Sequence, residues 1–181
     1  DAVGAGAVVS AGTRERVFQS PRGIRTVHQE SVDARVDEEG DALRGREHLD
    51  ALRGKPIILF VPHFVGLNMG GARLAHEYPG SASIYSRQKN PVLDRIFLHG
   101  RMRFGSPILL SRQDGMRATV KTLREGRLLY FLPDMDFGPR DALFVPFFGV
   151  PAATVTALPR LAQLGRATVV PAIARQLERG Y

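Results

Sequence analysis

From Pro56 onward the sequence alternates short apolar runs with stretches of helical length, and this alternation constrains the fold more than any other feature. The first run, 57–61, is apolar throughout, which is typical of a strand buried on both faces. Later strands are predicted at 83–86, 107–110, 128–132, 143–145 and 168–174, and helices at 67–78, after Asn90, between Asp114 and Gly126, and at 154–165. Such alternation predicts a layered α/β domain with a largely parallel or mixed sheet flanked by helices.

Two of the predicted helices have recognisable first residues. Asn90 is a favoured N-cap residue, and Pro91 after it is well tolerated in the first turn of a helix. Asp114 is predicted to cap the helix that ends at Gly126. These caps support the helical interpretation of the stretches that follow them.

The N-terminal part differs from the rest in pattern and in charge. Residues 1–45 show no sustained periodicity, so we predict an irregular lead-in there and an α/β domain over 46–181. Residues 56–181 carry 16 Lys/Arg against 8 Asp/Glu, whereas residues 1–55 carry 9 against 10. A basic domain suits nucleic acid, an anionic membrane surface or an acidic partner protein, but no zinc-finger, homeodomain or RNP-like pattern favours the first. Cysteine is absent, which excludes disulfides, cysteine nucleophiles and thiolate metal sites.

The longest uncharged run, 142–159, reaches the nominal length of a membrane helix but is interrupted by Pro146, Gly149, Pro151 and Pro159. We predict a strand, an apolar loop and the start of a helix over this run. Such a segment is ordinarily core, and an exposed rim that contacts lipid is the alternative.

Two segments are the first candidates for a functional site, because sites in parallel sheets usually lie at the carboxyl ends of strands. After the first strand, His63 is a candidate general base, and Asn68 in the next helix would orient its ring. After the strand at 128–132, Asp134 and Asp136 lie in a Pro/Gly-bounded loop. These two carboxylates would orient a substrate, bind a metal or act only as turn residues. For His63, the alternative to a general base is a purely structural histidine. Because the two strands are expected to be near neighbours, we predict one shared groove.

Known motifs of several other enzyme classes do not occur. The sequence lacks the Gly-x-Ser-x-Gly elbow of triad hydrolases, the Gly-x-Gly-x-x-Gly dinucleotide loop and the Walker A motif. The motifs that are present appear in a fixed order: His63 after the first strand; Tyr85-x-Arg87-x-x-Asn90-Pro91-x-Leu93-Asp94; Arg101; Asp114-Gly115-Met116; Pro133-Asp134-x-Asp136-x-Gly138-Pro139-Arg140; Phe144-Val145-Pro146-Phe147-Phe148-Gly149; and Val170-Pro171 with Arg175. In this order they resemble the bacterial lipid A biosynthesis acyltransferases, the late lauroyl and myristoyl transferases of the glycerolipid acyltransferase superfamily.

This resemblance implies an activity, partners and roles for single residues. The activity is transfer of a fatty acyl chain from acyl carrier protein to a hydroxyl of a lipid A precursor in lipopolysaccharide biosynthesis, at the cytoplasmic face of the bacterial inner membrane. His63 is implied as the general base with Asn68 beside it, without a metal or cofactor. The implied partners are acyl carrier protein, the lipid A precursor and the membrane surface, and nucleic acid is not among them. Substrate-binding roles fall on Arg87, Asn90, Arg101, Asp134, Asp136, Arg140 and Arg175.

The sequence departs from the family pattern in two ways. The family motif is His-x4-Asp/Glu, but residue 68 is Asn. An amide accepts a hydrogen bond from imidazole but cannot stabilise imidazolium by charge, and an Asp to Asn change in a Ser-His-Asp triad costs about four orders of magnitude in rate. A catalytically impaired homologue that binds lipid or acyl carrier protein without turnover is therefore the alternative function. The family usually begins with a hydrophobic anchoring segment and continues past the last motif, so the chain is expected to be the middle of a longer protein, without the C-terminal part of the family domain.

Overall fold

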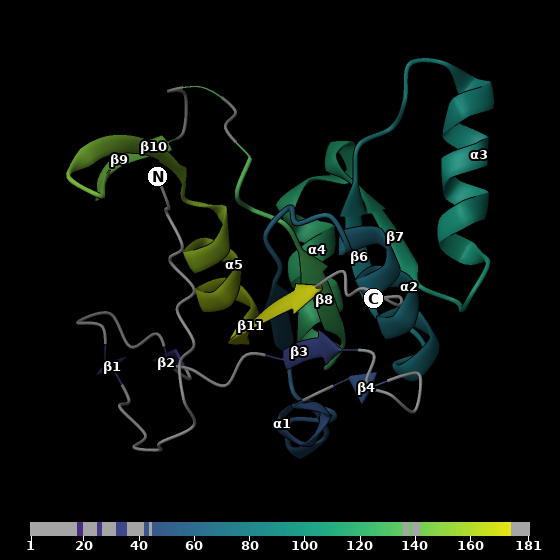
Figure 1. Ribbon diagram of the computed structural model, residues 1–181, viewed down its shortest axis with the longest axis horizontal. Coiled ribbons are helices and arrows are strands. Elements are labelled where there is room, and N and C mark those ends of the chain that lie inside the picture. Colours follow the sequence, from purple (N-terminus) through teal and green to yellow (C-terminus); the bar gives the residue numbers. More distant parts are fainter. Residues whose placement is uncertain are drawn as a thin grey trace, which may run out of the picture.

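The computed structural model describes residues 45–135, 138 and 142–174, together with the backbone of four short strands before residue 45. Those strands are β1 (Phe18–Gln19), β2 (Arg25–Thr26), β3 (Val32–Arg35) and β4 (Ala42–Leu43). The later elements are α1 (Arg46–Ala51), β5 (Ile57–Phe60), α2 (Leu67–Glu77), β6 (Ala82–Tyr85), α3 (Pro91–Met102), β7 (Ile108–Ser111), a 3₁₀ turn (Arg112–Asp114), α4 (Gly115–Arg124), β8 (Leu128–Phe131), β9 (Ala142–Phe147), β10 (Val150–Val155), α5 (Ala157–Gly165) and β11 (Thr168–Ala174) (Figure 1).

The main sheet contains five parallel strands in the order β11-β5-β8-β6-β7. In its centre, Ile58 of β5 lies opposite Leu129 of β8 on one side and Val169 of β11 on the other. The short strands β2 and β3 also pair with β11, and β1 and β4 pair with them in turn. The predicted layered α/β fold with a largely parallel sheet is confirmed, whereas the division of the chain at residue 45 stays a prediction.

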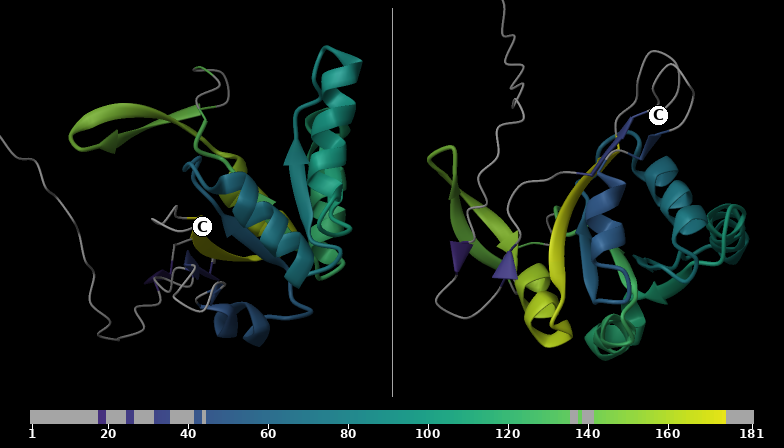
Figure 2. Two further views of the ribbon diagram at one scale, coloured as in Figure 1. Left: turned by 45° about the vertical axis from the view of Figure 1, so that its right-hand side comes forward. Right: turned by 90° about the horizontal axis from the view of Figure 1, so that it is seen from below.

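Helices cover both faces of this sheet, with α1 and α2 on one side and α4 and α5 on the other (Figure 2). Neighbouring residues of β5 contribute to different layers: Leu59 packs in the cluster that contains Leu74 of α2, and Ile58 packs in the cluster that contains Leu123 of α4. Burial of one such side chain stabilises the fold by about 2 kcal/mol. The strand at 57–60 is apolar throughout because it is covered on both faces.

The run at 142–159 contains the predicted strand, within β9, and the start of α5, but β10 stands where an apolar loop was predicted, so that 142–155 form a hairpin. β9 and β10 pair antiparallel, with Ala142 opposite Val155 and Phe147 opposite Val150. The predicted helix start at Thr154 is wrong, because Thr154 is paired with β9 and α5 begins only at Ala157.

The tip of this hairpin is apolar and exposed. Phe147 is 64% exposed and Phe148 is 94% exposed. Phe148 also has a φ of 49°, in the left-handed region that bulky side chains rarely adopt, and Gly149 follows at 79°. Within the described residues, the fold therefore places a large aromatic side chain in a strained position and covers very little of it.

Helix α3 stands at the open side of the sheet and buries none of its residues (Figure 1). Its start is the one predicted, because the Asn90 side chain accepts hydrogen bonds from the backbone of Val92 and Leu93 at 2.9 and 3.4 Å. The segment after it approaches α2 closely at Gly105, where an added Cβ would lie 2.5 Å from the carbonyl oxygen of Ala75.

Asp114 stands at the predicted N-cap position of α4, but its side chain does not cap that helix. Its carboxylate accepts a hydrogen bond from the backbone of Ser111 at 2.8 Å and makes no side-chain hydrogen bond to the first turn of α4. The 3₁₀ turn between β7 and α4 uses this carboxylate in a capping box of its own, which the sequence pattern did not reveal. In the part of the chain that the structure describes, no helix is long and apolar enough to cross a membrane.

Candidate active site

A cavity of about 1040 Å³ opens at the carboxyl ends of the parallel strands. Its lining includes His63 after β5, Ser86 after β6, Arg112 after β7 and Pro133 after β8. These positions follow four neighbouring strands, and the carboxyl ends of parallel strands meet at one edge of a sheet. The cavity therefore lies where the sequence pattern predicted a groove.

His63 and Asp134 form a bidentate pair at this edge. The Asp134 carboxylate accepts the backbone N–H of His63 through Oδ2 at 2.7 Å, and its Oδ1 lies 2.6 Å from Nδ1 of the imidazole ring. The residues are 71 positions apart in the chain and meet because β5 and β8 are adjacent and parallel. One carboxylate thus fixes both the main chain and the ring of the histidine.

The protonation of this pair follows from its surroundings. Burial raises the pKa of Asp134. The hydrogen bonds from the backbone and ring of His63 together lower it by more than burial raises it, so the pKa lies below its ordinary value. An ionised carboxylate only accepts hydrogen bonds, so Nδ1 of His63 must carry the hydrogen that it shares with Asp134. In the neutral form of the ring, Nε2 then carries the lone pair and is the atom that can accept a proton.

Asn68 lies in the first turn of α2 and lines the same cavity, but no hydrogen bond joins it to His63 among the residues that the structure describes. The start of α2 is fixed to the sheet by a hydrogen bond, in which the Tyr130 hydroxyl of β8 donates to the carbonyl oxygen of Leu67 at 2.7 Å. Burial raises the pKa of Tyr130, which keeps this hydroxyl protonated as a donor. The carboxylate that contacts the His63 ring therefore comes from the loop after β8 and not from α2.

One wall of the cavity is apolar and loosely packed. It comes from α3 and the segment after it, through Ile96, Phe97 and Phe104, which are 59%, 53% and 44% exposed. Gly100 lies in the same wall, and an added Cβ there would meet nothing within 4 Å. This wall gives the cavity room for a large apolar ligand.

The other predicted site residues have different positions. Arg101 of α3 lines the cavity, whereas Arg87 and Asn90 are exposed and outside its lining, and Asn90 is engaged as a helix cap. Asp136, Arg140 and Arg175 lie outside the described residues. Within the described part, no group of three or more His, Asp or Glu side chains is arranged to hold a metal ion.

Sequence reasoning missed several residues of the cavity. Ser111, Arg112 and Met116 line it at the carboxyl end of β7, next to the residues after β5 and β8. The same strand-end rule that selected His63 and Asp134 would have found them, because 107–110 was a predicted strand.

Comparison with known proteins agrees with these features. Residues 17–181 match the sequence profile of the family described as bacterial lipid A biosynthesis acyltransferase. The chain is 36% identical over 133 residues to the lipid A biosynthesis acyltransferase of Haemophilus influenzae, in an alignment that covers 72% of this chain and 42% of that protein. It is 34% identical over 144 residues to the lipid A biosynthesis myristoyltransferase of Escherichia coli (78% and 43% covered), and 33% identical over 139 residues to the lauroyltransferase of the same organism (75% and 44% covered).

The chain thus spans less than half the length of these relatives. The family profile, however, extends over almost all of it and includes the strands and loops that carry His63 and Asp134. On this match, the chain belongs to the bacterial lipid A biosynthesis acyltransferase family.

Proposed function

We propose that this chain carries the reaction centre of a lipid A acyltransferase, with His63 as the general base and Asp134 as the carboxylate that orients it. The observation that carries the proposal is the His63–Asp134 pair with its 2.6 Å contact beside a large cavity that has an apolar wall. The donor is a fatty acyl thioester of acyl carrier protein, and the acceptor is a hydroxyl of a lipid A precursor.

The reaction proceeds by addition and elimination at the thioester carbonyl. Nε2 of His63 takes the proton of the acceptor hydroxyl as its oxygen bonds to the carbonyl carbon. The carbon–sulfur bond then breaks, and the imidazolium returns the proton to the leaving thiolate, which leaves an ester and a free thiol. Asp134 stabilises the imidazolium by charge in the interval.

Other groups of the cavity bind the substrates and stabilise negative charge. Arg101 lines the cavity and offsets negative charge on the oxyanion or on a phosphate of the acceptor. The apolar wall of α3 takes the acyl chain, because burial of methylene groups is favourable by about 0.8 kcal/mol each. Asp136, Arg140 and Arg175 keep their proposed substrate-binding roles as predictions.

Asn68 was one ground for the alternative of a binding protein without turnover. An amide at that position matters less when an ionised carboxylate from another loop already contacts the ring, and here Asp134 does so at 2.6 Å. We therefore favour the enzyme over the binding protein.

The acyl-transfer proposal is tested with the full-length protein, an acyl carrier protein donor and a lipid A precursor. His63→Ala is expected to lower kcat by about 10³-fold or more, since a general base is removed together with its orientation. The matched control is His76→Ala, which alters an exposed histidine of α2 outside the cavity lining. Equal turnover in the protein and its His63→Ala variant would overturn the assignment of the base.

Membrane contact is the second part of the proposal, with the enzyme acting at the cytoplasmic face of the inner membrane. The strained and 94% exposed Phe148 at the tip of the hairpin supports it, since a bulky side chain at positive φ costs about 1–2 kcal/mol and is retained only where something offsets that cost. Basic residues beside the exposed apolar side chains of α3, such as Arg95 and Arg103, suit anionic lipid headgroups.

Cosedimentation with vesicles that contain phosphatidylglycerol tests this contact. Phe148→Asp is expected to lower the bound fraction without changing the thermal midpoint by more than a few degrees, because the side chain makes little contact with the described fold. Unchanged vesicle binding by this variant would remove the hairpin from the proposed membrane surface.

A further inference from the structure

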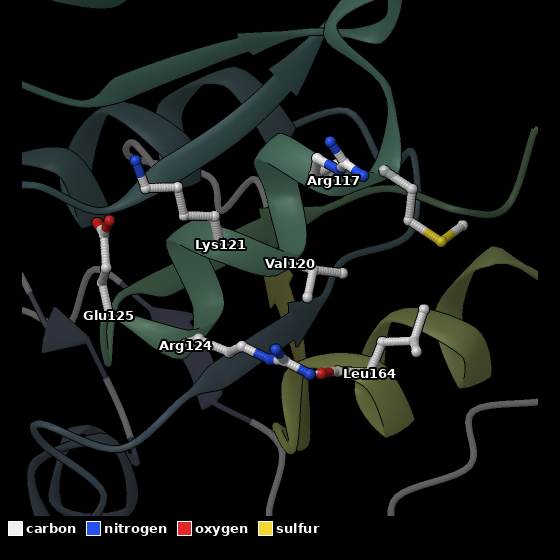
Figure 3. A pocket seen from close by; sticks show the side chains of 7 residues that line it. Arg117, Val120, Lys121, Arg124, Glu125 and Leu164 are labelled. Carbon is white, nitrogen blue, oxygen red and sulfur yellow. Dashed lines mark hydrogen bonds between the residues drawn. The ribbon is translucent and has the colours of Figure 1, made fainter.

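A second hollow of about 610 Å³ lies between α4 and α5, on the helical layer that covers one face of the sheet (Figure 3). Its rim carries Arg117, Lys121 and Arg124 of α4, and its floor contains Val120 together with Leu164 of α5, which is 46% exposed. The three cationic residues recur at spacings of four and three, which places them along one side of the helix. The hollow thus combines a basic rim with a small apolar floor.

The positive charge of this rim is largely uncompensated. Glu125 is the acidic residue in the lining, and its carboxylate accepts a hydrogen bond from Arg127 at 3.2 Å. Arg124 reaches across to α5, where its Nε donates to the backbone oxygen of Leu164 at 3.1 Å (Figure 3). Among the residues that the structure describes, neither Arg117 nor Lys121 has an ion-pair partner within 4.0 Å.

Like charges one turn apart on a helix repel each other and destabilise it. Arg117 and Lys121 have this spacing and are both exposed. The arrangement therefore lowers the stability of α4 slightly in the free protein. An acidic surface placed against the rim would remove this repulsion.

The hollow adjoins the proposed reaction centre. Met116 lines both the hollow and the cavity that contains His63. A protein held on α4 would therefore lie beside the part of the cavity wall formed by Met116, and a flexible arm from it would enter the cavity past the first turn of α4.

We propose that the basic rim of Arg117, Lys121 and Arg124 docks an acidic helix of the acyl carrier protein and thereby delivers the acyl thioester to the cavity past Met116. The inference rests on the proposed acyl-transfer function, and it assigns the donor protein to a particular surface. A concave basic surface fits a convex acidic protein, whereas a membrane is met by protruding apolar elements, which in this molecule are the hairpin and α3.

The test compares two donors in the full-length protein. In the double variant Arg117→Glu/Lys121→Glu, kcat/KM with acyl carrier protein is expected to fall about tenfold or more, because reversed charges slow association and weaken the complex. Turnover of an acyl-pantetheine thioester, which has no protein to dock, is expected to change less than threefold. Lys55→Glu is the matched control, since it reverses an exposed charge before β5, at the opposite end of the strands from the cavity.

Binding is measured separately from turnover, by fluorescence anisotropy of carrier protein labelled on its arm. Loss of binding in the double variant but not in Lys55→Glu supports the docking surface even if no donor is turned over, in which case the proposed function fails and the surface stands. Unchanged carrier binding in the double variant overturns the proposal. Carrier binding that is intact while binding to phosphatidylglycerol vesicles is lost would assign the rim to the membrane instead and would equally overturn it.

Discussion

The half of the sheet formed by β11, β5 and β8 is packed on both faces, whereas β6 and β7 are only partly buried and α3 beside them buries none of its residues; β6, β7 and α3 are called the open half below. Leu59 and Leu129 of the packed half are 2% and 0% exposed, while Ile96 and Phe97 of α3 are 59% and 53% exposed. The His63–Asp134 pair follows two strands of the packed half, and the apolar cavity wall comes from the open half. The difference indicates that the two halves have different roles. The short contact between His63 and Asp134 is positioned by well-packed strands, whereas the cavity wall proposed to bind a flexible acyl chain belongs to a loosely packed helix.

The largest expected effect comes from removing the negative charge of Asp134, which follows β8 of the packed half. Asp134→Asn is expected to lower kcat for acyl transfer by about 10³- to 10⁴-fold, because the amide neither stabilises the imidazolium nor enforces the same tautomer. Steady-state kinetics with an acyl carrier protein donor measure this effect. Asn68→Ala is the matched control at the cavity, and a larger loss there than at Asp134 would return the orienting role to residue 68.

A second prediction concerns the packing itself. Leu129→Ala is expected to lower the free energy of unfolding by about 2–5 kcal/mol, since it empties a fully buried position between two helical layers. Leu93→Ala in α3, where the side chain is 47% exposed, is expected to cost less than about 1 kcal/mol. Urea denaturation monitored by circular dichroism gives both values, and equal costs for the two variants would contradict the contrast between the halves.

A third prediction concerns Gly105, where the segment after α3 closely approaches α2. An added Cβ there would lie 2.5 Å from the carbonyl oxygen of Ala75, so Gly105→Ala must shift the segment after α3 and is expected to cost about 1–3 kcal/mol. Gly100→Ala is the matched control inside α3, because its Cβ would meet nothing within 4 Å, and it is expected to stabilise the helix by up to about 1 kcal/mol. A thermal midpoint that is unchanged in Gly105→Ala would mean that α3 is not held by this close approach.

The smallest effect is a pH dependence of stability. The folded pKa of Asp134 lies below its ordinary value, so the carboxylate stabilises the fold above the pKa of the unfolded chain and ceases to do so as the pH falls through the folded pKa. The part of the free energy of unfolding that depends on the Asp134 charge should therefore be lost as the pH falls below about 4, so the difference between the protein and Asp134→Asn should narrow there. A difference that widens on acidification would have the wrong sign for this carboxylate.

Most strands and helices of the packed half could be predicted from the sequence. Fewer features of the other segments could be predicted, for identifiable physical reasons. The apolar run of β5 and the cap at Asn90 are local signals, and the structure retains both. Thr154 was assigned to a helix because its own neighbours favour one, but pairing with β9 overrides that preference. Asp114 was placed correctly at the start of α4, but its carboxylate binds the backbone of Ser111 instead, because a capping residue between two turns can serve either.

The position of the cavity at the strand ends was predicted, but the contact between His63 and Asp134 was not. Strand-end reasoning brought His63 and Asp134 to one groove, yet the family motif drew attention to residue 68 as the partner of the ring. The actual contact joins residues 71 positions apart and depends on the register of β5 against β8, where Phe60 lies opposite Phe131. No local pattern contains that register, so the partner of His63 emerges only from the assembled sheet.

The tautomer of His63 tests the central claim most directly, because it reports the Asp134 contact without requiring turnover. Long-range ¹⁵N–¹H correlation spectra at neutral pH, with the ring assigned through His63→Ala, distinguish a hydrogen on Nδ1 from one on Nε2. The account predicts the Nδ1–H form in the protein and in Asn68→Ala, and its loss in Asp134→Asn, since a carboxylate that only accepts holds the hydrogen on the facing nitrogen. An Nε2–H ring in the unaltered protein, or a tautomer that changes with Asn68→Ala and not with Asp134→Asn, would contradict it.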